Sequence, residues 1–105
     1  MHTFIHTMRY CFDVAKNAAN RAKHGFDLSD APRVIESGAV LTFRDRRFDY
    51  GEDRFITIGP LEDKLVVVVT AETDDVVRVI SMREATSHEK EIFRSQGRRS
   101  ATADR

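Results

Sequence analysis

The chain has 105 residues, of which 41% are hydrophobic and 32% are charged, and its 17 basic and 17 acidic residues leave no formal net charge. This composition is typical of one globular domain and excludes a disordered chain. The lack of net charge also argues against a dedicated duplex-DNA binder, which needs a strong positive field, although a local basic site can still hold a phosphate.

A single cysteine and scattered histidines limit the chemistry that the chain can host. Cys11 has no partner for an internal disulfide, so we expect a reducing, cytoplasmic compartment. With no second cysteine and four dispersed histidines, we expect no metal ion and no other cofactor. The longest apolar run, residues 65–69, is far shorter than the about 18 residues that span a membrane, so neither insertion nor secretion is expected.

The first third of the chain predicts two short helices. Asp13 is a typical N-cap, the alanines that follow it favour a helix, and Gly25 is placed to stop that helix. A second short helix carries Pro32 in its first turn, where proline is tolerated, and buries Val34 and Ile35.

The hydrophobic period then changes to that of β-strands. The third strand is a continuous valine-rich run, which indicates a central strand covered on both faces. Gly59-Pro60 predicts a turn after the second strand, and residues 72–75 predict a hairpin turn after the third. A final helix is expected to begin at Thr86 or Ser87. The four strands are predicted at 39–43, 54–59, 64–70 and 76–82.

The order of these elements predicts the fold class. Short connections between successive strands favour an antiparallel meander, and helices packed on such a sheet give an α+β domain. We therefore expect one domain over residues 1–105, with two N-terminal helices, a four-stranded antiparallel sheet and a C-terminal helix. Residues 1–9 are expected to form an N-terminal extension, and the polar residues 97–105 a flexible tail.

Four segments of the sequence follow the pattern of a known family. They cover residues 12–25, 41–59, 66–72 and 78–89. The longest ordered stretches are RFDYGEDRFITIG at 47–59 and RVISMREAT at 78–86. Together these segments resemble the BrnT toxins, and the resemblance extends over about residues 10–93.

The resemblance to BrnT toxins implies a fold, an activity and a partner. The implied fold is RelE-like, with a curved antiparallel sheet, and the implied activity is a metal-independent endoribonuclease that cleaves RNA and inhibits translation. The implied partner is a BrnA-like antitoxin that covers the toxin and represses the shared operon, so operator DNA would be contacted only through the antitoxin. A homodimer within that complex is left open.

The sequence departs from the pattern of the resembled family at three places. Val14 stands where the family usually has proline, residues 71–73 read Ala-Glu-Thr instead of Thr-Glu-Arg, and Phe93 stands where tyrosine is frequent. The arginine missing at Thr73 would lie beside a candidate phosphate site. This leaves open an alternative, a catalytically weakened or inactive binding module that only pairs with an antitoxin. A DNA-binding repressor is disfavoured because no helix-turn-helix pattern is present.

Metal-free RNA cleavage makes arginines the first candidates for catalysis. The 2′-hydroxyl must lose a proton, the phosphorane must be stabilised, and the leaving 5′-oxygen must gain a proton. Arginine suits the second task because its planar fork matches phosphate oxygens and stays charged. We assign it to Arg83 and Arg78 on the fourth strand and to Arg54 at the start of the second. If side chains alternate strictly along the fourth strand, Arg83 lies on the same face of the sheet as Val79, and Arg78 lies on the same face as Met82.

Each of these arginines also has a purely structural alternative. Arg83 can pair with Glu84 or Glu89, Arg54 can pair with Glu52, and Arg78 can lie at an edge with its head in water. The candidates for proton transfer also have structural alternatives. Basic residues in the last turn of a helix stabilise the helix dipole, and an acidic residue in a hairpin turn can simply be solvated. These candidates are Lys23, His24 and Glu72, and further RNA contacts are assigned to Arg47, Tyr50 and His88.

Overall fold

The structure, a computed structural model, describes residues 9–47, 49 and 51–103. It is an α+β fold, as predicted, in which short helices precede the main strands and one long helix follows them. The helices are α1 (Val14–His24), the 3-10 turn η1 (Leu28–Asp30), α2 (Ala31–Ile35) and α3 (Ser87–Ala103). The strands are β1 (Arg9–Cys11), β2 (Leu41–Arg44), β3 (Arg54–Leu61), β4 (Lys64–Glu72) and β5 (Val76–Glu84).

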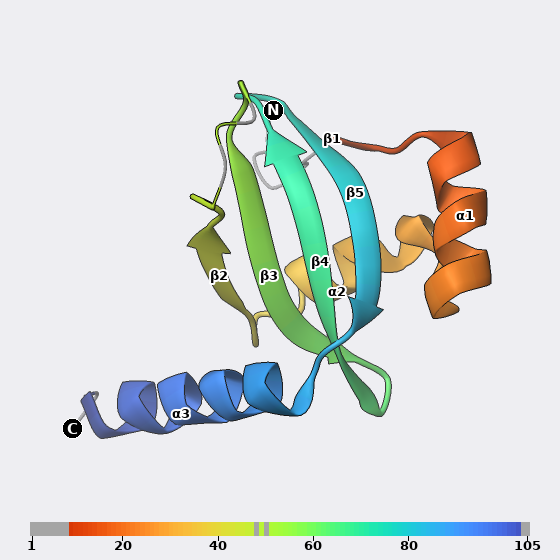
Figure 1. The fold of residues 1–105 in the computed structure, drawn as a ribbon. Helices are drawn as coiled ribbons and strands as arrows, with labels where there is room; N and C mark the ends of the chain where they lie inside the picture. The colour runs from red at the N-terminus through yellow and green to blue at the C-terminus, as the bar shows by residue number, and fades with distance from the viewer. Residues whose placement is uncertain (1–8, 48, 50, 104–105) are drawn as a thin grey trace, which may run out of the picture.

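The strands form one mixed sheet of five strands in the order β1-β5-β4-β3-β2 (Figure 1). Strands β2 to β5 form the predicted antiparallel meander. The prediction of a purely antiparallel four-stranded sheet is wrong, because β1 pairs with β5 in parallel, starting at Arg9 opposite Val76. A strand of three residues is too short to show a period of two, so the sequence places Arg9 in the N-terminal extension.

Capping side chains fix the two predicted N-terminal helices. The Asp13 carboxylate accepts a hydrogen bond from the Lys16 amide at 2.9 Å, and Gly25 ends α1 in the left-handed conformation at φ 79°. Asp27 caps η1 in the same way, and Pro32 lies in the first turn of α2. The predicted caps are therefore confirmed, with one 3-10 turn between the two helices.

The face of the sheet that α1, η1 and α2 cover, called here the helix face, holds the larger core. Leu28 and Val34 come from η1 and α2 and are fully buried against valines of β4 and β5. Asn20 ties α1 to this face, because its amide nitrogen donates to the carbonyls of Phe26 and Met82 and its oxygen accepts from the Met82 amide. All polar groups of the buried Asn20 side chain are thus satisfied.

The opposite face is covered at one end only. Phe93 of α3 packs there against Ile58 and Val67, both 1% exposed. Figure 1 shows α3 crossing one end of the sheet, and no other described helix lies on this face. Since Val66 and Val68 are buried on the helix face and Val67 on this one, β4 is the predicted central strand covered on both faces.

Two boundaries differ from the predicted ones. Gly59 and Pro60 lie inside β3, and the turn comes at Glu62, with φ 57°, and Asp63. Gly59 is needed for close packing instead, because a Cβ there would lie 2.6 Å from Cγ1 of Val40. The backbone of α3 is helical as far as Ala103, through most of the segment predicted as a tail. Among the described residues, no helix is long and apolar enough to cross a membrane.

Candidate active site

A β-bulge in β5 decides which way the arginines point. The pairing with β4 shifts between Val69 and Thr70, which leaves Ile80 as an extra residue in β5. Each residue of a regular strand alternates in side, so an extra residue reverses the alternation beyond it. Arg78 and Arg83, which strict alternation places on opposite faces, therefore share one face.

The predicted parity of Arg78 and Arg83 is thus wrong for the residues beyond the bulge. Val79 and Met82, the residues with which they were grouped, belong to the core of the helix face. The two arginines point instead to the opposite face, called here the arginine face, where Arg83 lies across from Val67. The bulge keeps the guanidinium groups out of the apolar core.

Arg54 joins the same face from β3. It lies opposite Ala71 of β4, and Ala71 lies opposite Arg78 of β5, so these residues form one row across the sheet. The small side chain of Ala71 leaves room for the two long side chains beside it. The three arginines predicted as catalytic are therefore brought to one face of the sheet.

Glu52 connects Arg54 and Arg78. Its Oε2 accepts from Nε of Arg54 at 2.9 Å, and its Oε1 accepts from Nη2 of Arg78 at 2.7 Å. These hydrogen bonds, first that of Arg54 and then that of Arg78, lower the pKa of Glu52 below its usual value. One ionised carboxylate is shared by two guanidinium groups, so the trio keeps one positive charge.

Arg83 is held by Glu89 at the start of α3. Two hydrogen bonds, 2.7 and 2.8 Å, join its Nη atoms to the two carboxylate oxygens. Glu89 also accepts from the Thr86 amide, while Thr86 Oγ1 accepts from the Glu89 amide, which is a capping box. The Arg83 hydrogen bonds are the main cause that lowers the pKa of Glu89 to about 2. The same interaction raises the pKa of Arg83.

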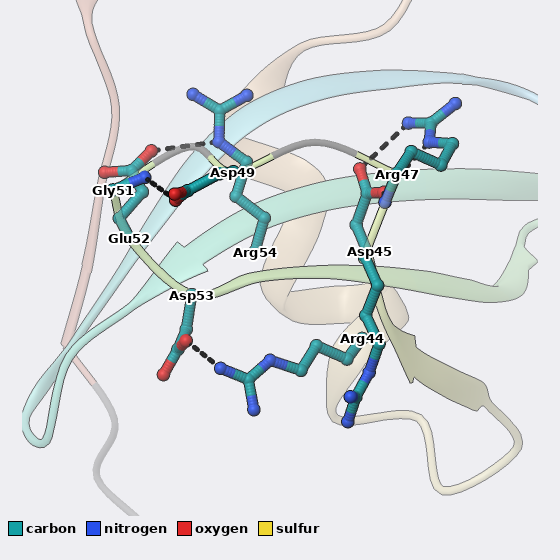
Figure 2. A pocket seen from close by; sticks show the side chains of 9 residues that line it. Arg44, Asp45, Arg47, Asp49, Gly51, Glu52, Asp53 and Arg54 are labelled. Atoms are coloured by element: carbon teal, nitrogen blue, oxygen red, sulfur yellow. Dashed lines mark hydrogen bonds and ion pairs between the residues drawn. The ribbon is translucent and has the colours of Figure 1, made fainter.

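Arg47 approaches from the loop between β2 and β3. Its Nε and Nη2 each donate to the buried Asp45 carboxylate at 2.9 Å. Figure 2 shows Arg47 and Arg54 on one side of the loop, away from the Arg44–Asp53 ion pair. The positive charge of Arg47 is close enough to Arg83 to oppose the rise in the pKa of Arg83. The loop forms a pocket of about 790 Å³, which both Arg47 and Arg54 line (Figure 2).

Glu72 lies at the same end of the sheet as Arg78. Both line a pocket of about 160 Å³, together with Glu52 and Thr73. The Glu72 carboxylate accepts a hydrogen bond from Thr70 Oγ1 at 3.1 Å, and both side chains leave β4 on the helix face, opposite to Arg78. Thr73, where the resembled family usually has arginine, is therefore a neighbour of Arg78.

The remaining predicted residues are not all gathered at the arginines. Lys23 and His24 form the end of α1, which packs against β5 from the helix face. The structure therefore does not bring them together with Arg54, Arg78 or Arg83. His88 is exposed in the first turn of α3, next to Glu89. Tyr50 lies outside the described residues.

Three carboxylates of the site were not among the predicted functional residues. Glu52 and Glu89 are predicted only as structural partners of the arginines, and Asp45 is part of the family pattern but has no predicted role. The sequence contains usable signs of two of them, because Asp45-x-Arg47 and Glu52-x-Arg54 repeat one spacing. Among the described residues, no group of three His, Cys, Asp or Glu side chains is arranged to hold a metal ion.

Comparison with known families identifies the chain. A family model described as the ribonuclease toxin BrnT of type II toxin–antitoxin systems matches residues 12–89. The chain belongs to the BrnT family. The matched region contains the four arginines of the site and their carboxylate partners, from Asp45 to Glu89. A search of curated proteins gave no match. As a BrnT toxin, the chain has a protein antitoxin as its expected partner.

Proposed function

We propose that this BrnT chain is a metal-independent endoribonuclease that cleaves RNA and thereby inhibits translation in the cytoplasm. One observation carries the proposal: Arg54, Arg78 and Arg83 share one face of the sheet, with Arg47 beside them. Membership of a family of ribonuclease toxins supports the same activity.

The arginines would bind and stabilise the reacting phosphate. In the proposed reaction the 2′-oxygen attacks phosphorus, a phosphorane forms, and the 5′-oxygen leaves with a proton. Negative charge increases on the non-bridging oxygens during this step, and fixed guanidinium donors are suited to stabilise it. Arg78 uses only Nη2 towards Glu52, which leaves its other donors for phosphate oxygens.

We assign proton removal from the 2′-hydroxyl to Glu72. Glu72 follows Val68 and Thr70 in the alternation of β4, so its side chain leaves the strand on the helix face, but it lies at the end of the sheet and lines the same pocket as Arg78. Lys23 and His24 are not among the residues that line that pocket. Glu89 and Glu52 are poorer bases, because their arginine partners lower the pKa of both carboxylates. In this scheme Glu52 and Glu89 position the arginines, and Glu72 takes the proton.

Production of the chain in a bacterium without its antitoxin tests the proposal. We expect growth arrest and RNA fragments, and cleavage by the purified protein in EDTA to leave 2′,3′-cyclic phosphate ends. Arg83→Ala should abolish the arrest while the protein stays folded. Arg33→Ala, which removes an exposed arginine from α2, is the matched control and should remain toxic. Harmless accumulation of the unchanged chain would refute the proposal.

The alternative is a non-catalytic module whose arginines anchor an antitoxin. Two observations favour it: each of the four arginines already has a carboxylate partner, and Thr73 stands in the Arg78 pocket where the family usually has arginine. Thr73→Arg separates the two functions. It should raise a cleavage activity that is present but weak, and it should create none in a pure binding module.

The proposed antitoxin is BrnA-like and covers the arginine face. An antitoxin segment with carboxylates would compete with RNA phosphates for the same guanidinium groups. Co-expression with a BrnA-like antitoxin should therefore restore growth. Substitution of Arg54 and Arg78 should weaken the complex as well as cleavage.

A further inference from the structure

A row of one exposed and three half-buried side chains crosses the arginine face between the two rows that carry the arginines. In register, Phe43 of β2 lies opposite Ile56, Ile56 opposite Val69, and Val69 opposite Ser81. We call these four residues the central strip. The row on one side of the strip contains Arg54 and Arg78, and the row on the other side contains Arg83. The strip is therefore flanked by guanidinium groups on both sides.

The central strip is the part of this face that α3 leaves uncovered. In the next row Ile58 and Val67 are each 1% exposed beneath Phe93, whereas Phe43 is 42% exposed. Among the described residues, only Phe43 and Val14 are exposed large hydrophobic side chains. Val14 begins α1, which packs on the helix face, so Phe43 is the exposed aromatic ring of the arginine face.

The backbone that carries Phe43 is held in place. On the opposite side of the same strand pair, the hydroxyls of Thr42 and Thr57 are hydrogen-bonded at 3.0 Å. Backbone pairing continues on both sides of Phe43, from Leu41 to Arg44. With the backbone fixed in this way, only the side-chain torsions of Phe43 have to be ordered when a ligand stacks on the ring.

The charges around the strip fit an anionic ligand. The four flanking ion pairs and bridges contain four arginines and three carboxylates, which leaves one positive charge. Phe43 lies at the β2 end of the strip, with Arg54 on the neighbouring strand and Arg78 and Arg83 at the β5 end. An aromatic ring on a surface that also carries phosphate-binding groups is the arrangement by which proteins bind unpaired nucleotides, with the base on the ring and the backbone on the cations. A base inside a duplex has no free face to offer to such a ring.

We propose that Phe43 stacks on one unpaired nucleobase of a single-stranded RNA whose phosphates lie on the flanking arginines. This rests on the proposed function and adds to it the class of substrate: RNA is bound as a single strand, with a base displaced onto the central strip. Phe43 is then a binding residue that selects unpaired nucleotides, and Ile56 and Val69 form the apolar floor beside it.

Binding of a non-cleavable single strand tests the role of Phe43. The probes are short fluorescent oligouridine and oligoadenosine strands with 2′-O-methyl groups, and the protein is the full chain separated from its antitoxin. Phe43→Ala should weaken binding by about 5- to 150-fold, the range for loss of one base–aromatic stack. Phe43→Tyr should bind as the unchanged chain does, and Phe43→Leu should resemble Phe43→Ala. Val14→Ala is the control and should change nothing.

Probes that lack a base show whether the lost contact is a stack. We expect one abasic position in the strand to weaken binding to the unchanged chain but not to Phe43→Ala, because both changes remove the same contact. Equal weakening of both proteins at every abasic position would overturn the inference. So would Phe43→Ala with unchanged RNA binding and weaker antitoxin binding, which would make the strip an antitoxin surface.

The inference and the proposed function fail in different ways. If the unchanged chain neither cleaves nor binds RNA, the proposed function is wrong. If it cleaves RNA, depends on Arg83, and is insensitive to Phe43→Ala and Phe43→Leu, only the stacking role is wrong. Thermal unfolding of each variant shows that it is folded, and the Tyr variant is a second check because it keeps the ring.

Discussion

The helix face and the arginine face belong to the same strands but are built for different tasks. On the helix face Leu28, Val34 and Met82 are completely buried, and the buried amide of Asn20 has all its partners. On the other face, charged groups surround a strip that includes a 42% exposed phenylalanine. The comparison indicates that the fold derives its stability mainly from one side of the sheet and leaves the other free for ligands. Substitutions on the two faces should therefore differ in what they damage.

The largest effect is expected from truncation of the helix-face core. Leu28 is 0% exposed beneath the sheet, so Leu28→Ala removes buried apolar volume and leaves a cavity. We expect the free energy of unfolding to fall by about 2–5 kcal/mol, measured by urea denaturation. Because a domain of this size is only marginally stable, toxicity should fall through loss of folded protein. A stable Leu28→Ala protein would mean that the arginine face contributes more stability than we infer.

An equally deep loss of activity, without a loss of stability, is expected on the arginine face. Arg78→Ala should lower the rate of RNA cleavage by about 100- to 1000-fold, the effect of removing one fixed donor from a charged transition state. Arg78→Lys should recover little, because a point charge cannot replace the planar fork. Urea midpoints should stay near that of the unchanged chain. A fall in stability as large as that of Leu28→Ala would make Arg78 a structural residue.

A smaller loss of stability is expected when a polar side chain is removed, and this loss should differ between the two faces. Asn20→Ala leaves the carbonyls of Phe26 and Met82 and the amide of Met82 without their side-chain partner, and Asn20 is buried. The expected cost is about 1–3 kcal/mol in the free energy of unfolding. Ser81→Ala, at a half-buried residue of the arginine face, is the comparison and should cost less. Equal costs would show that α1 is not anchored through Asn20.

The parts of the fold that sequence could predict are those set by local chemistry. Asp13 and Gly25 carry their capping roles within a few residues of chain, and the valine run of β4 shows its double burial directly. Arg54, Arg78 and Arg83 could be predicted as catalytic residues from their residue type, their positions on the strands and the family pattern alone. That they share one face of the sheet could not be predicted in this way, because the extra residue at Ile80 is defined only by the pairing of β5 with β4.

Non-local contacts account for the other differences from the predictions. Gly59 looks like a turn residue until Val40 is known to pack against it. Glu52 pairs with Arg54 two residues away, which the sequence suggests, but also with Arg78 from a strand that follows a long hairpin, which it does not. The three residues of β1 pair only because β5 presents a free edge. Sequence therefore predicted components of the site better than their geometry.

The smallest expected effect concerns acid stability on the arginine face. Glu89 has a pKa of about 2 in the folded chain, mainly because of Arg83, against an ordinary value of 4.5. A lowered folded pKa gives stability that is present above the ordinary pKa and is lost as pH falls towards the folded one. The loss should therefore occur between about pH 5 and pH 2. We expect about 1 kcal/mol, because Arg83 is 36% exposed and water screens the pair.

Glu89→Gln tests the origin of this acid sensitivity. Glutamine keeps the capping box with Thr86 but cannot ionise, so the variant should be less stable at pH 7 and should lose less on acidification. Asp63→Asn, at an exposed turn, is the control and should follow the unchanged chain. If Glu89→Gln and the unchanged chain lose the same stability between pH 5 and pH 2, the Arg83–Glu89 pair does not stabilise the fold. The remaining role of Glu89 would then be to position Arg83 for RNA. In that case the Arg83–Glu89 pair would serve function, as the Arg54–Glu52–Arg78 trio does, and not stability, as the helix-face core does.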